Sequence, residues 1–274
     1  MEAAQQAVSF GVIADCQYAD VPAEGVREFR LSLAKLRECV EQFNRLELDF
    51  VLQLGDLIDR DESGFDAVRP ILDTLRAECF HVLGNHDYGV TDGRQPDVPG
   101  WIGLTNKYYQ FTRGGVRFVV LDGNDISLHA HPSTSPERAA AARYHARLDP
   151  APPAWNGAIS KRQLEWLDEL LTRADAAGER VVVACHFPVH PDNRLNLWNA
   201  RDVRDCLVSH PSVQAYLSGH DHDGRLGVFR GLPFLTLKGM VDTRENAYAV
   251  ITLEKGRLLV RGFGREPDRV LAPR

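Results

Sequence analysis

The sequence predicts an α/β protein in which strand and helix units build a mixed sheet. Two observations lead to this fold class. Short apolar runs alternate with helical patterns, and polar clusters follow the apolar runs directly. The chain has 274 residues and is 44% hydrophobic, so it can bury a large core as one big domain or two small ones. We expect one domain spanning residues 1–274.

The first half of the chain repeats the order strand, loop and helix. Strands are expected at Val8–Ala14, Phe50–Leu54 and Cys79–Leu83. The first helix is indicated by apolar residues at spacings of four, three, four and three, namely Phe29, Leu33, Leu36, Val40 and Phe43. A second helix is expected over Phe65–Ala77. Each expected strand therefore ends in a loop that carries polar side chains.

The rest of the chain is richer in strands. A hairpin is expected over Tyr108–Phe111 and Val116–Leu121, turning at Gly114–Gly115, and the pattern then fails between Asp122 and Ile159. Ser160 and Gln163 form a capping box for a helix that stops near Gly178. The remaining expected elements are strands at Val181–Cys185, Val213–Leu217, Leu226–Phe229, Phe234–Leu237, Tyr248–Leu253 and Leu258–Phe263, a helix near Ala200–Val208 and a turn at Lys255–Gly256.

Composition narrows the class of partner. The net charge of −6 and the pI near 5.9 argue against a nucleic-acid polymer, because such binding usually needs a surplus of Lys and Arg. No stretch approaches a membrane span, and the N-terminal residues have no basic region followed by a long apolar one. We therefore expect a cytoplasmic protein that acts on a small nucleotide-type molecule and not at a membrane. The five cysteines are widely spaced and predict reduced thiols, not disulfides.

Five clusters of metal-competent side chains fall just beyond expected strands. They are Asp15-Cys16-Gln17, Gly55-Asp56-Leu57-Ile58-Asp59-Arg60, Gly84-Asn85-His86-Asp87, His186, and Gly219-His220-Asp221-His222. Ligand sites of open α/β sheets gather beyond the carboxyl ends of the strands, so loops far apart in sequence can converge there. Carboxylate, amide and imidazole together suit manganese, iron, zinc or cobalt, and eight donors are enough for two ions.

Each cluster by itself has an ordinary structural explanation. An aspartate after a strand often makes a turn, Gly-Asn-His-Asp is common turn chemistry, and a lone histidine is often a core residue. Gly-His-Asp-His is the strongest single cluster. Five clusters in order, each after an expected strand, are harder to assign to chance and favour a dinuclear metal site.

These clusters resemble the calcineurin-like metallophosphoesterases, whose ordered motifs are D-x-H/Q, G-D-x-x-D, G-N-H-D/E, a lone His and G-H-x-H. The sequence is most similar to the manganese-dependent ADP-ribose/CDP-alcohol diphosphatases, through FGVIADCQYAD, VLQLGDLID, HVLGNHDY, CHFPVHPD with LWNARD, SGHDHDG and GFGREPDRV. The resemblance runs from Phe10 to Val270. It implies a four-layer α/β/β/α sandwich with a dinuclear metal site at its loop edge.

The resemblance also implies a role for each matching residue. Asp15, Gln17 and His222 would hold one ion, Asn85, His186 and His220 the other, and Asp56 would bridge the two. His86 would protonate or stabilise the leaving oxygen, and Asp59 would orient its imidazole. Manganese is the expected metal, with iron, zinc or cobalt also compatible. Gln17 stands where much of the wider family has histidine, so its ion should be held less tightly.

Substrate contacts are assigned more loosely. Arg60 could clamp a phosphate, although a solvated surface arginine is the alternative. Tyr18, Tyr88, Trp101, Tyr109, Trp155 and Trp198 offer aromatic faces for a nucleobase, each with a core or surface role as the alternative. On the resemblance alone, we expect contacts from Tyr18, Asn156 and Trp198.

The expected activity is metal-dependent hydrolysis of the diphosphate of ADP-ribose or of CDP-alcohols of the CDP-choline type. The products would be a nucleoside monophosphate and a phosphorylated partner. A cyclic-nucleotide or general phosphodiesterase on the same metal core is the alternative enzyme. A catalytically silent metal-binding scaffold is the alternative outside enzymes. The sequence does not determine the oligomeric state.

Overall fold

Two mixed sheets packed face to face form the centre of the molecule in the computed structural model, which describes residues 7–254 and 256–272. The first has the order β14-β13-β12-β1-β2-β3, and the second has the order β10-β11-β9-β8-β5-β4. The strands of the first sheet are β1 (Val8–Ile13), β2 (Phe50–Gln53), β3 (Cys79–His81), β12 (Ala247–Glu254), β13 (Arg257–Gly264) and β14 (Arg269–Leu271). Those of the second are β4 (Tyr109–Arg113), β5 (Val116–Val120), β8 (Arg180–Ala184), β9 (Val213–Ser218), β10 (Arg225–Phe229) and β11 (Leu232–Thr236).

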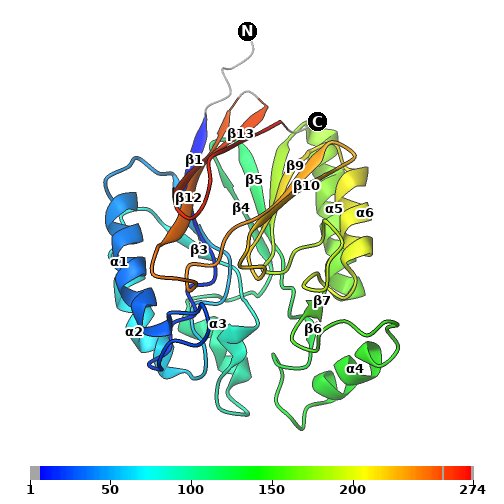
Figure 1. Ribbon diagram of the computed structural model, residues 1–274. Helices are drawn as coiled ribbons and strands as arrows, with labels where there is room; N and C mark the ends of the chain where they lie inside the picture. The colour runs from blue at the N-terminus through cyan, green and yellow to red at the C-terminus, as the bar shows by residue number, and fades with distance from the viewer. Residues whose placement is uncertain (1–6, 255, 273–274) are drawn as a thin grey trace.

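Helices cover the outer face of each sheet (Figure 1). α1 (Ser32–Phe43) and α2 (Ser63–Leu72) lie on the first sheet, and α5 (Lys161–Ala177) and α6 (Ala200–Ser209) lie on the second. The smaller elements are η1 (Phe29–Leu31), η2 (His86–Tyr88), η3 (Gln95–Asp97), α3 (Val98–Trp101), α4 (Pro136–His145) and the pair β6 (Ile126–Ser127) and β7 (Gly157–Ala158). The layers are therefore helix, sheet, sheet and helix, which confirms the expected four-layer sandwich.

An aromatic cluster fills the space between the two sheets. The rings of Phe10 and Phe50 stack with their centroids 4.7 Å apart, and Phe118 of the facing sheet packs edge-on against both. Such pairs bury large apolar areas in preferred geometries. They hold the two sheets in one fixed relation, so loops from both sheets can build one site.

Parallel strands carry every predicted ligand loop. β1 pairs parallel with β2, β2 with β3, and β8 with both β5 and β9. β2 and β9 are buried along their whole length, as expected for parallel strands covered on both faces. The loops after β1, β2, β3, β8 and β9 therefore leave at carboxyl ends of parallel strands, as the sequence predicted.

The segment between Asp122 and Ile159 corrects the expectation of an irregular region. It holds α4, which begins with Ser135 accepting a hydrogen bond from the Arg138 amide and with Pro136 at its first turn. Only Ala141 of this helix is buried. The helix lacks an apolar stripe, and for that reason the hydrophobic pattern did not reveal it.

Two other expectations need smaller corrections. α2 ends at Leu72 and not at Ala77, because the Thr74 hydroxyl donates to the Ile71 carbonyl and the chain turns there. The capping box of α5 is half formed. Ser160 accepts from the Gln163 amide, but the Gln163 side chain bonds to the backbone of Asp122.

Two sequence expectations fall on residues outside the described part of the chain. The N-terminal stretch used to judge a leader includes residues 1–6, and the predicted turn at Lys255–Gly256 includes Lys255. Among the residues described, no helix combines the length and the apolar character needed to cross a membrane.

Candidate metal centre

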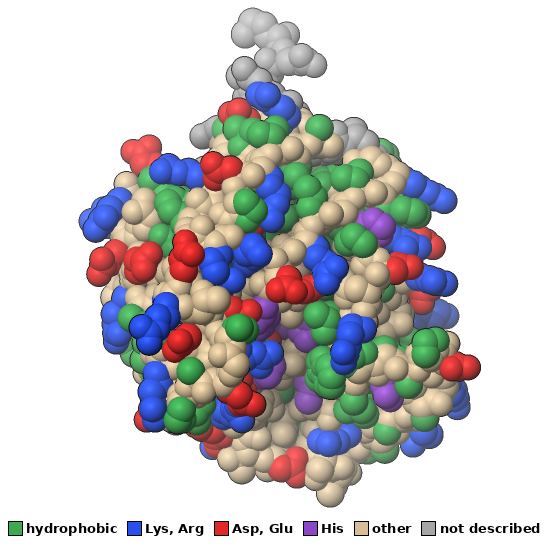
Figure 2. Space-filling model, in the orientation of Figure 1, with side chains coloured by type: hydrophobic (Ala, Val, Ile, Leu, Met, Phe, Trp, Pro, Cys, Tyr) green, Lys and Arg blue, Asp and Glu red, His purple; other side chains and the backbone are tan. Residues whose placement is uncertain are grey.

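The predicted ligands converge at the carboxyl ends of five strands, although they are up to 207 residues apart in sequence, from Asp15 to His222. Asp15, Asp56 and His186 are fully buried, Gln17 is 1% exposed, and Asn85 and His220 are below 10%. Figure 2 shows histidine side chains gathered near the middle of one face. Buried polar groups need hydrogen-bond partners or ions, so the contacts among these side chains indicate what they can bind.

Asp56 lies at the centre of the group. Its Oδ2 is 3.1 Å from Gln17 Nε2 and 3.2 Å from His186 Nε2, and its Oδ1 accepts from the His86 amide at 2.7 Å. Burial raises the pKa of this carboxyl, but the nearby His186 and His86 outweigh burial and hold it well below its usual range. Asp56 is therefore a charged carboxylate shared by both halves of the group, as the bridging role requires.

One half of the group surrounds Asp15. His222 Nε2 lies 3.4 Å from Asp15 Oδ1 and 3.2 Å from Gln17 Nε2. The Oε1 atom of Gln17 is buried without a hydrogen-bond partner among the described residues. A half-turn of this amide exchanges its oxygen and nitrogen, and the oxygen would then face the carboxylate and imidazole as a cation ligand does. The orphaned amide thus fits a metal ion.

The other half surrounds His186. Its Nε2 lies 3.1 Å from Asn85 Oδ1 and 3.2 Å from His220 Nδ1. Asp56, His186 and His220 have donor atoms that all lie within 4.8 Å of one another. Two groups of donors that share one carboxylate match the expected pair of ions in number and type.

Each of the three imidazoles has its second nitrogen held by the protein. His186 Nδ1 donates to the Leu54 carbonyl at 2.8 Å, and His222 Nδ1 donates to Asp242 at 3.0 Å. His220 Nε2 donates to Asn156 Oδ1 at 3.0 Å. A carbonyl or carboxylate on one nitrogen fixes the tautomer and presents the other lone pair inward, an arrangement typical of metal-binding histidines.

The electrostatics of the group call for positive charge. Burial lowers the pKa of His222, but Asp15 and Asp242 outweigh it and raise the pKa to about 10. Burial also lowers the pKa of His186, but Asp56 outweighs burial and raises this pKa to about 9. Protonation of these two rings balances the negative charge of the nearby carboxylates, and bound cations would neutralise the same charge.

The backbone at this centre is strained. Asp15, Gln17, Asp56 and His220 all have positive φ, between 44° and 67°. Gly84 approaches so closely that a Cβ atom would lie 2.1 Å from Asp56 Oδ1. Strain of this kind costs on the order of 1–3 kcal/mol per residue and concentrates at functional sites. Here it aims the side chains of three loops at one point.

The predicted catalytic pair is also assembled. His86 Nδ1 donates to Asp59 Oδ1 at 3.0 Å, and the His86 side chain is 28% exposed. This bond leaves Nε2 to meet a substrate. Burial lowers the pKa of His86, but Asp56 and Asp59 raise it above its ordinary value overall. The pair thus has the geometry and charge of a proton donor next to the metal donors.

The structure places the four predicted substrate contacts away from the space over the metal donors. A hollow of about 640 Å³ opens over the metal donors, and its lining contains none of Arg60, Tyr18, Asn156 and Trp198. Arg60 forms an ion pair with Glu24 at 2.7 Å, and the backbone of Tyr18 forms an isolated parallel β-bridge with Ile58.

Asn156 and Trp198 have other surroundings. Asn156 is fully buried and donates to the carbonyls of Arg194 and Asn196, so it positions His220 and does not face the hollow. Trp198 lines a neighbouring hollow, where its indole donates to the Pro153 carbonyl. This placement argues against direct substrate contact by either side chain.

Other side chains form the rim of the hollow. Arg27, Val26, Trp155 and Arg194 line it above the metal donors. Val26 and Trp155 are 61% and 48% exposed, and the Arg194 guanidinium lies 5.5 Å from the centre of the Trp155 ring. Sequence reasoning named Trp155 only as one of six aromatics and missed Arg27 and Arg194, because isolated arginines carry no pattern.

Two further carboxylates support the ligands: Asp242 was missed, and Asp87 was named within its cluster without a role of its own. Asp242 holds His222, and Asp87 accepts from the amides of Gly84, Asp56 and Leu57 at 2.7–3.0 Å, which ties the second and third ligand loops together. Asp242 follows the apolar residues Met240 and Val241. A polar residue directly after an apolar run was the signal that could have identified it.

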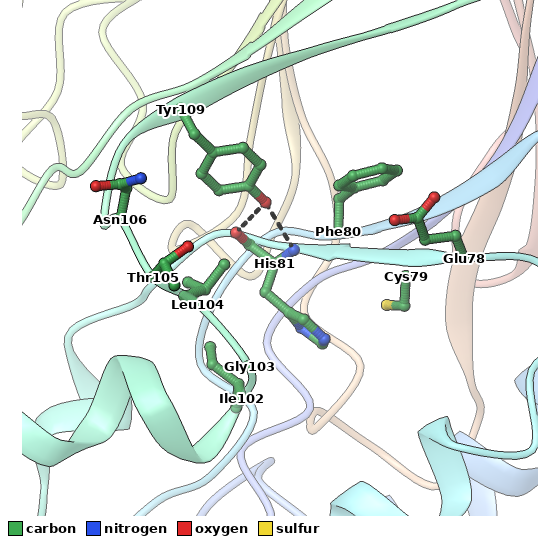
Figure 3. Close-up of a pocket in the computed structure, with 10 residues that line it drawn as sticks. All are labelled: Glu78, Cys79, Phe80, His81, Ile102, Gly103, Leu104, Thr105, Asn106 and Tyr109. Carbon is green, nitrogen blue, oxygen red and sulfur yellow. Dashed lines mark hydrogen bonds between the residues drawn. The ribbon is translucent and has the colours of Figure 1, made fainter.

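A second hollow, of about 260 Å³, lies at the edge where β3 meets β4 (Figure 3). The Tyr109 hydroxyl sits between the amide and the carbonyl of His81 and satisfies both. This bond closes the exposed edge of β3. Within the described residues, this hollow holds no group of metal-competent donors.

Comparison with known proteins agrees with this geometry. Residues 8–224 match the model of the family described as calcineurin-like phosphoesterase. A manganese-dependent ADP-ribose/CDP-alcohol diphosphatase from Danio rerio is 33% identical over 95% of this chain and 96% of that protein, and one from Homo sapiens is 28% identical over 98% and 94%.

A solved structure is similar over the same length. The crystal structure of a dimetal phosphatase from Danio rerio superposes with a TM-score of 0.88 at 31% identity, covering 97% of this chain and 99% of that one. The resemblance expected from the sequence is confirmed over nearly the whole chain.

Proposed function

Because this chain belongs to the calcineurin-like phosphoesterase family, we propose that it hydrolyses the diphosphate bond of a nucleoside diphosphate linked to a sugar or alcohol. Substrates would be of the ADP-ribose or CDP-alcohol type, which the names of its relatives specify for those proteins. The products would be a nucleoside monophosphate and a phosphorylated sugar or alcohol.

One observation carries the proposal. Three imidazoles turn one nitrogen each into the group of donors: His222 toward Asp15, His186 toward Asp56 and His220 toward His186. Asp242, Leu54 and Asn156 hold the opposite nitrogens. A purely structural cluster would not need three tautomers set in this way. The arrangement supports a site for two divalent cations, for which we propose manganese.

The metal ligands would be Asp15, Gln17, Asp56 and His222 for one ion and Asp56, Asn85, His186 and His220 for the other. When bound, two such ions supply the positive charge that polarises phosphoryl oxygens and stabilises an in-line displacement. The buried carboxylates and imidazoles fix the positions of the ions before substrate arrives, so little reorganisation is needed during the reaction.

His86 would act on the leaving group. Asp59 holds its Nδ1, so a proton on Nε2 can pass to the oxygen that departs from phosphorus. General acid catalysis of this kind contributes roughly 10²–10⁴-fold. His86 lines the hollow and Asp59 is 7% exposed, which is consistent with one group that touches substrate and one that positions it.

The rim of the hollow has the chemistry of a nucleotide. Trp155 and Val26 offer exposed apolar surface on which a planar base can stack, and Arg27 and Arg194 bring positive charge toward a diphosphate. No side-chain ion pair is formed by either arginine among the described residues. Stacking of a base on an aromatic ring contributes on the order of 1–3 kcal/mol.

The test is release of AMP from ADP-ribose and of CMP from CDP-choline. The purified protein is stripped of metal and then given manganese, magnesium or zinc. Manganese-dependent turnover of either compound supports the proposal. Turnover of cyclic AMP or bis(p-nitrophenyl) phosphate, with neither diphosphate cleaved, would retain the metal centre and replace the substrate. Absence of all hydrolysis after manganese addition would indicate a silent metal-binding scaffold.

A further inference from the structure

A second group of metal-competent side chains lies on the outer face of the second sheet, where α5 and α6 run side by side (Figure 1). It consists of Asp168 from α5, Cys206 from α6 and His210, which caps the carboxyl end of α6. Their donor atoms all lie within 4.8 Å of one another. The predicted dinuclear centre does not use these residues.

The distances from Asp168 to the other two donors are close to those expected around a bound zinc ion. His210 Nε2 and Cys206 Sγ lie 3.1 Å and 3.9 Å from the same oxygen, Asp168 Oδ1. Around a tetrahedral zinc ion, the corresponding nitrogen–oxygen and sulfur–oxygen separations would be about 3.3 Å and about 3.6 Å. Small side-chain rotations would therefore bring all three donors to bonding distance.

His210 is held for this role by the chain itself. Its Nδ1 donates to Asp175 Oδ2 at 2.7 Å, and Asp175 Oδ1 accepts from the Ser212 amide at 2.9 Å. The carboxylate therefore fixes the ring and directs Nε2 toward Asp168. This is the relation that Asp242 has to His222 in the candidate metal centre, and it is common behind metal-binding histidines.

Sequence spacing and helix geometry add to this arrangement. Cys206 lies in the last turn of α6, and His210 directly follows the last residue of this helix, four positions further along the chain. The carboxyl end of a helix carries partial negative charge, which favours a cation at that position. Thiolate, imidazole and carboxylate together suit zinc and cobalt better than manganese or magnesium.

We propose that Asp168, Cys206 and His210 bind one zinc-type divalent ion, with water as the fourth ligand. The ion would link α5 to α6 on the outer face of the second sheet. Binding breaks the Cys206 S–H bond, forms the metal–sulfur bond and releases the proton to solvent. The inference does not depend on the proposed hydrolytic function.

Without an ion, the thiol should remain protonated. Burial, followed by the negative charge of Asp168, raises the pKa of Cys206 to about 12. A bound divalent ion would reverse this effect, because its charge stabilises the thiolate.

Cobalt titration of the full chain tests the site directly. A thiolate bound to Co²⁺ gives a sulfur-to-metal charge-transfer absorption in the near ultraviolet, whereas the proposed dinuclear centre contains only nitrogen and oxygen donors. We expect this absorption to reach the intensity of one thiolate-bound ion per chain and to be lost in Cys206→Ser. Cys79→Ser changes another partly buried thiol and should retain it.

A second measurement does not depend on the spectrum. Zinc in large excess over its dissociation constant should raise the Tm of the unsubstituted chain by roughly 5 °C more than that of Asp168→Asn. Asp168 is mostly exposed, so the substitution itself should be tolerated.

Manganese-dependent hydrolysis should be unchanged in both variants, which separates this site from the proposed dinuclear centre. No charge-transfer absorption, or one that persists in Cys206→Ser, would overturn the proposal. Equal zinc effects on both Tm values would also overturn it, leaving His210 only as a hydrogen-bond partner of Asp168 and Asp175.

Discussion

The floor and the rim of the 640 Å³ hollow are built on different principles. The floor is the group of buried metal donors, in which Gln17 and His220 line the hollow and Asp56 bonds to Gln17 from within the group. The rim consists of exposed side chains such as Trp155 and Val26, whose partners are few. The floor is set for one chemistry before any ligand arrives, whereas the rim can adapt to what the ligand carries. Changes in the floor should therefore affect turnover, and changes in the rim should affect substrate affinity.

The largest effect is expected at the centre of the floor. Asp56→Asn removes the charge shared by both groups of donors, so hydrolysis should fall by roughly 10³-fold or more, and the metal content should drop below two ions per chain. Metal analysis and initial rates check this, with the Tm as a control for folding. Two bound ions together with full activity would overturn the ligand assignment.

The next effect is expected at His86. His86→Ala should lower kcat by roughly 10²-fold or more while the metal content stays unchanged, because this side chain acts on the leaving group and not on the ions. Asp59→Asn should lower kcat less, since it only loosens the imidazole. If His86→Ala loses metal, or if Asp59→Asn has the larger effect, the division of roles is wrong.

Residues behind the ligands should give an intermediate effect. Asp242→Asn and Asn156→Ala remove the partners of His222 and His220, so the affinity for metal should fall by roughly 10–100-fold. Excess manganese should then restore much of the turnover. For Asn156, an unchanged metal affinity with a raised KM would instead support direct substrate contact.

The rim should give a smaller effect of another kind. Trp155→Ala and Arg194→Ala should raise KM for ADP-ribose by roughly 10-fold, with little change in kcat or in the hydrolysis of bis(p-nitrophenyl) phosphate, which lacks the nucleoside. Trp198→Ala is the matched control, because Trp198 lines the neighbouring hollow. A higher KM in the control but not in Trp155→Ala would indicate that the base binds in the neighbouring hollow instead.

The smallest effect is expected at Arg60. This side chain is 47% exposed and paired with Glu24, and an exposed ion pair of this kind contributes about 0–1 kcal/mol. Arg60→Ala should change kcat and KM by less than about twofold. A tenfold rise in KM would restore the phosphate-clamp hypothesis for this arginine.

The sequence by itself determined the floor. Asp15, Asp56, Asn85, His186 and the two histidines of Gly-His-Asp-His each follow an apolar run, and the carboxyl ends of parallel strands must meet at one edge of a sheet. The order of elements followed from the same periodicity. Local pattern and overall fold agree there, so short-range rules were sufficient.

Only the tertiary structure decided the rim and the supports behind the ligands. Asn156 reaches His220 across 64 residues and Asp242 reaches His222 across 20, while Trp155 and Arg194 come from a stretch with no regular strand or helix. α4 escaped detection because it buries one residue, and Cys206 meets Asp168 only because two helices lie side by side. Such contacts depend on how packed layers bring distant segments together, and the hydrophobic pattern of a single segment contains no information about its neighbour in space.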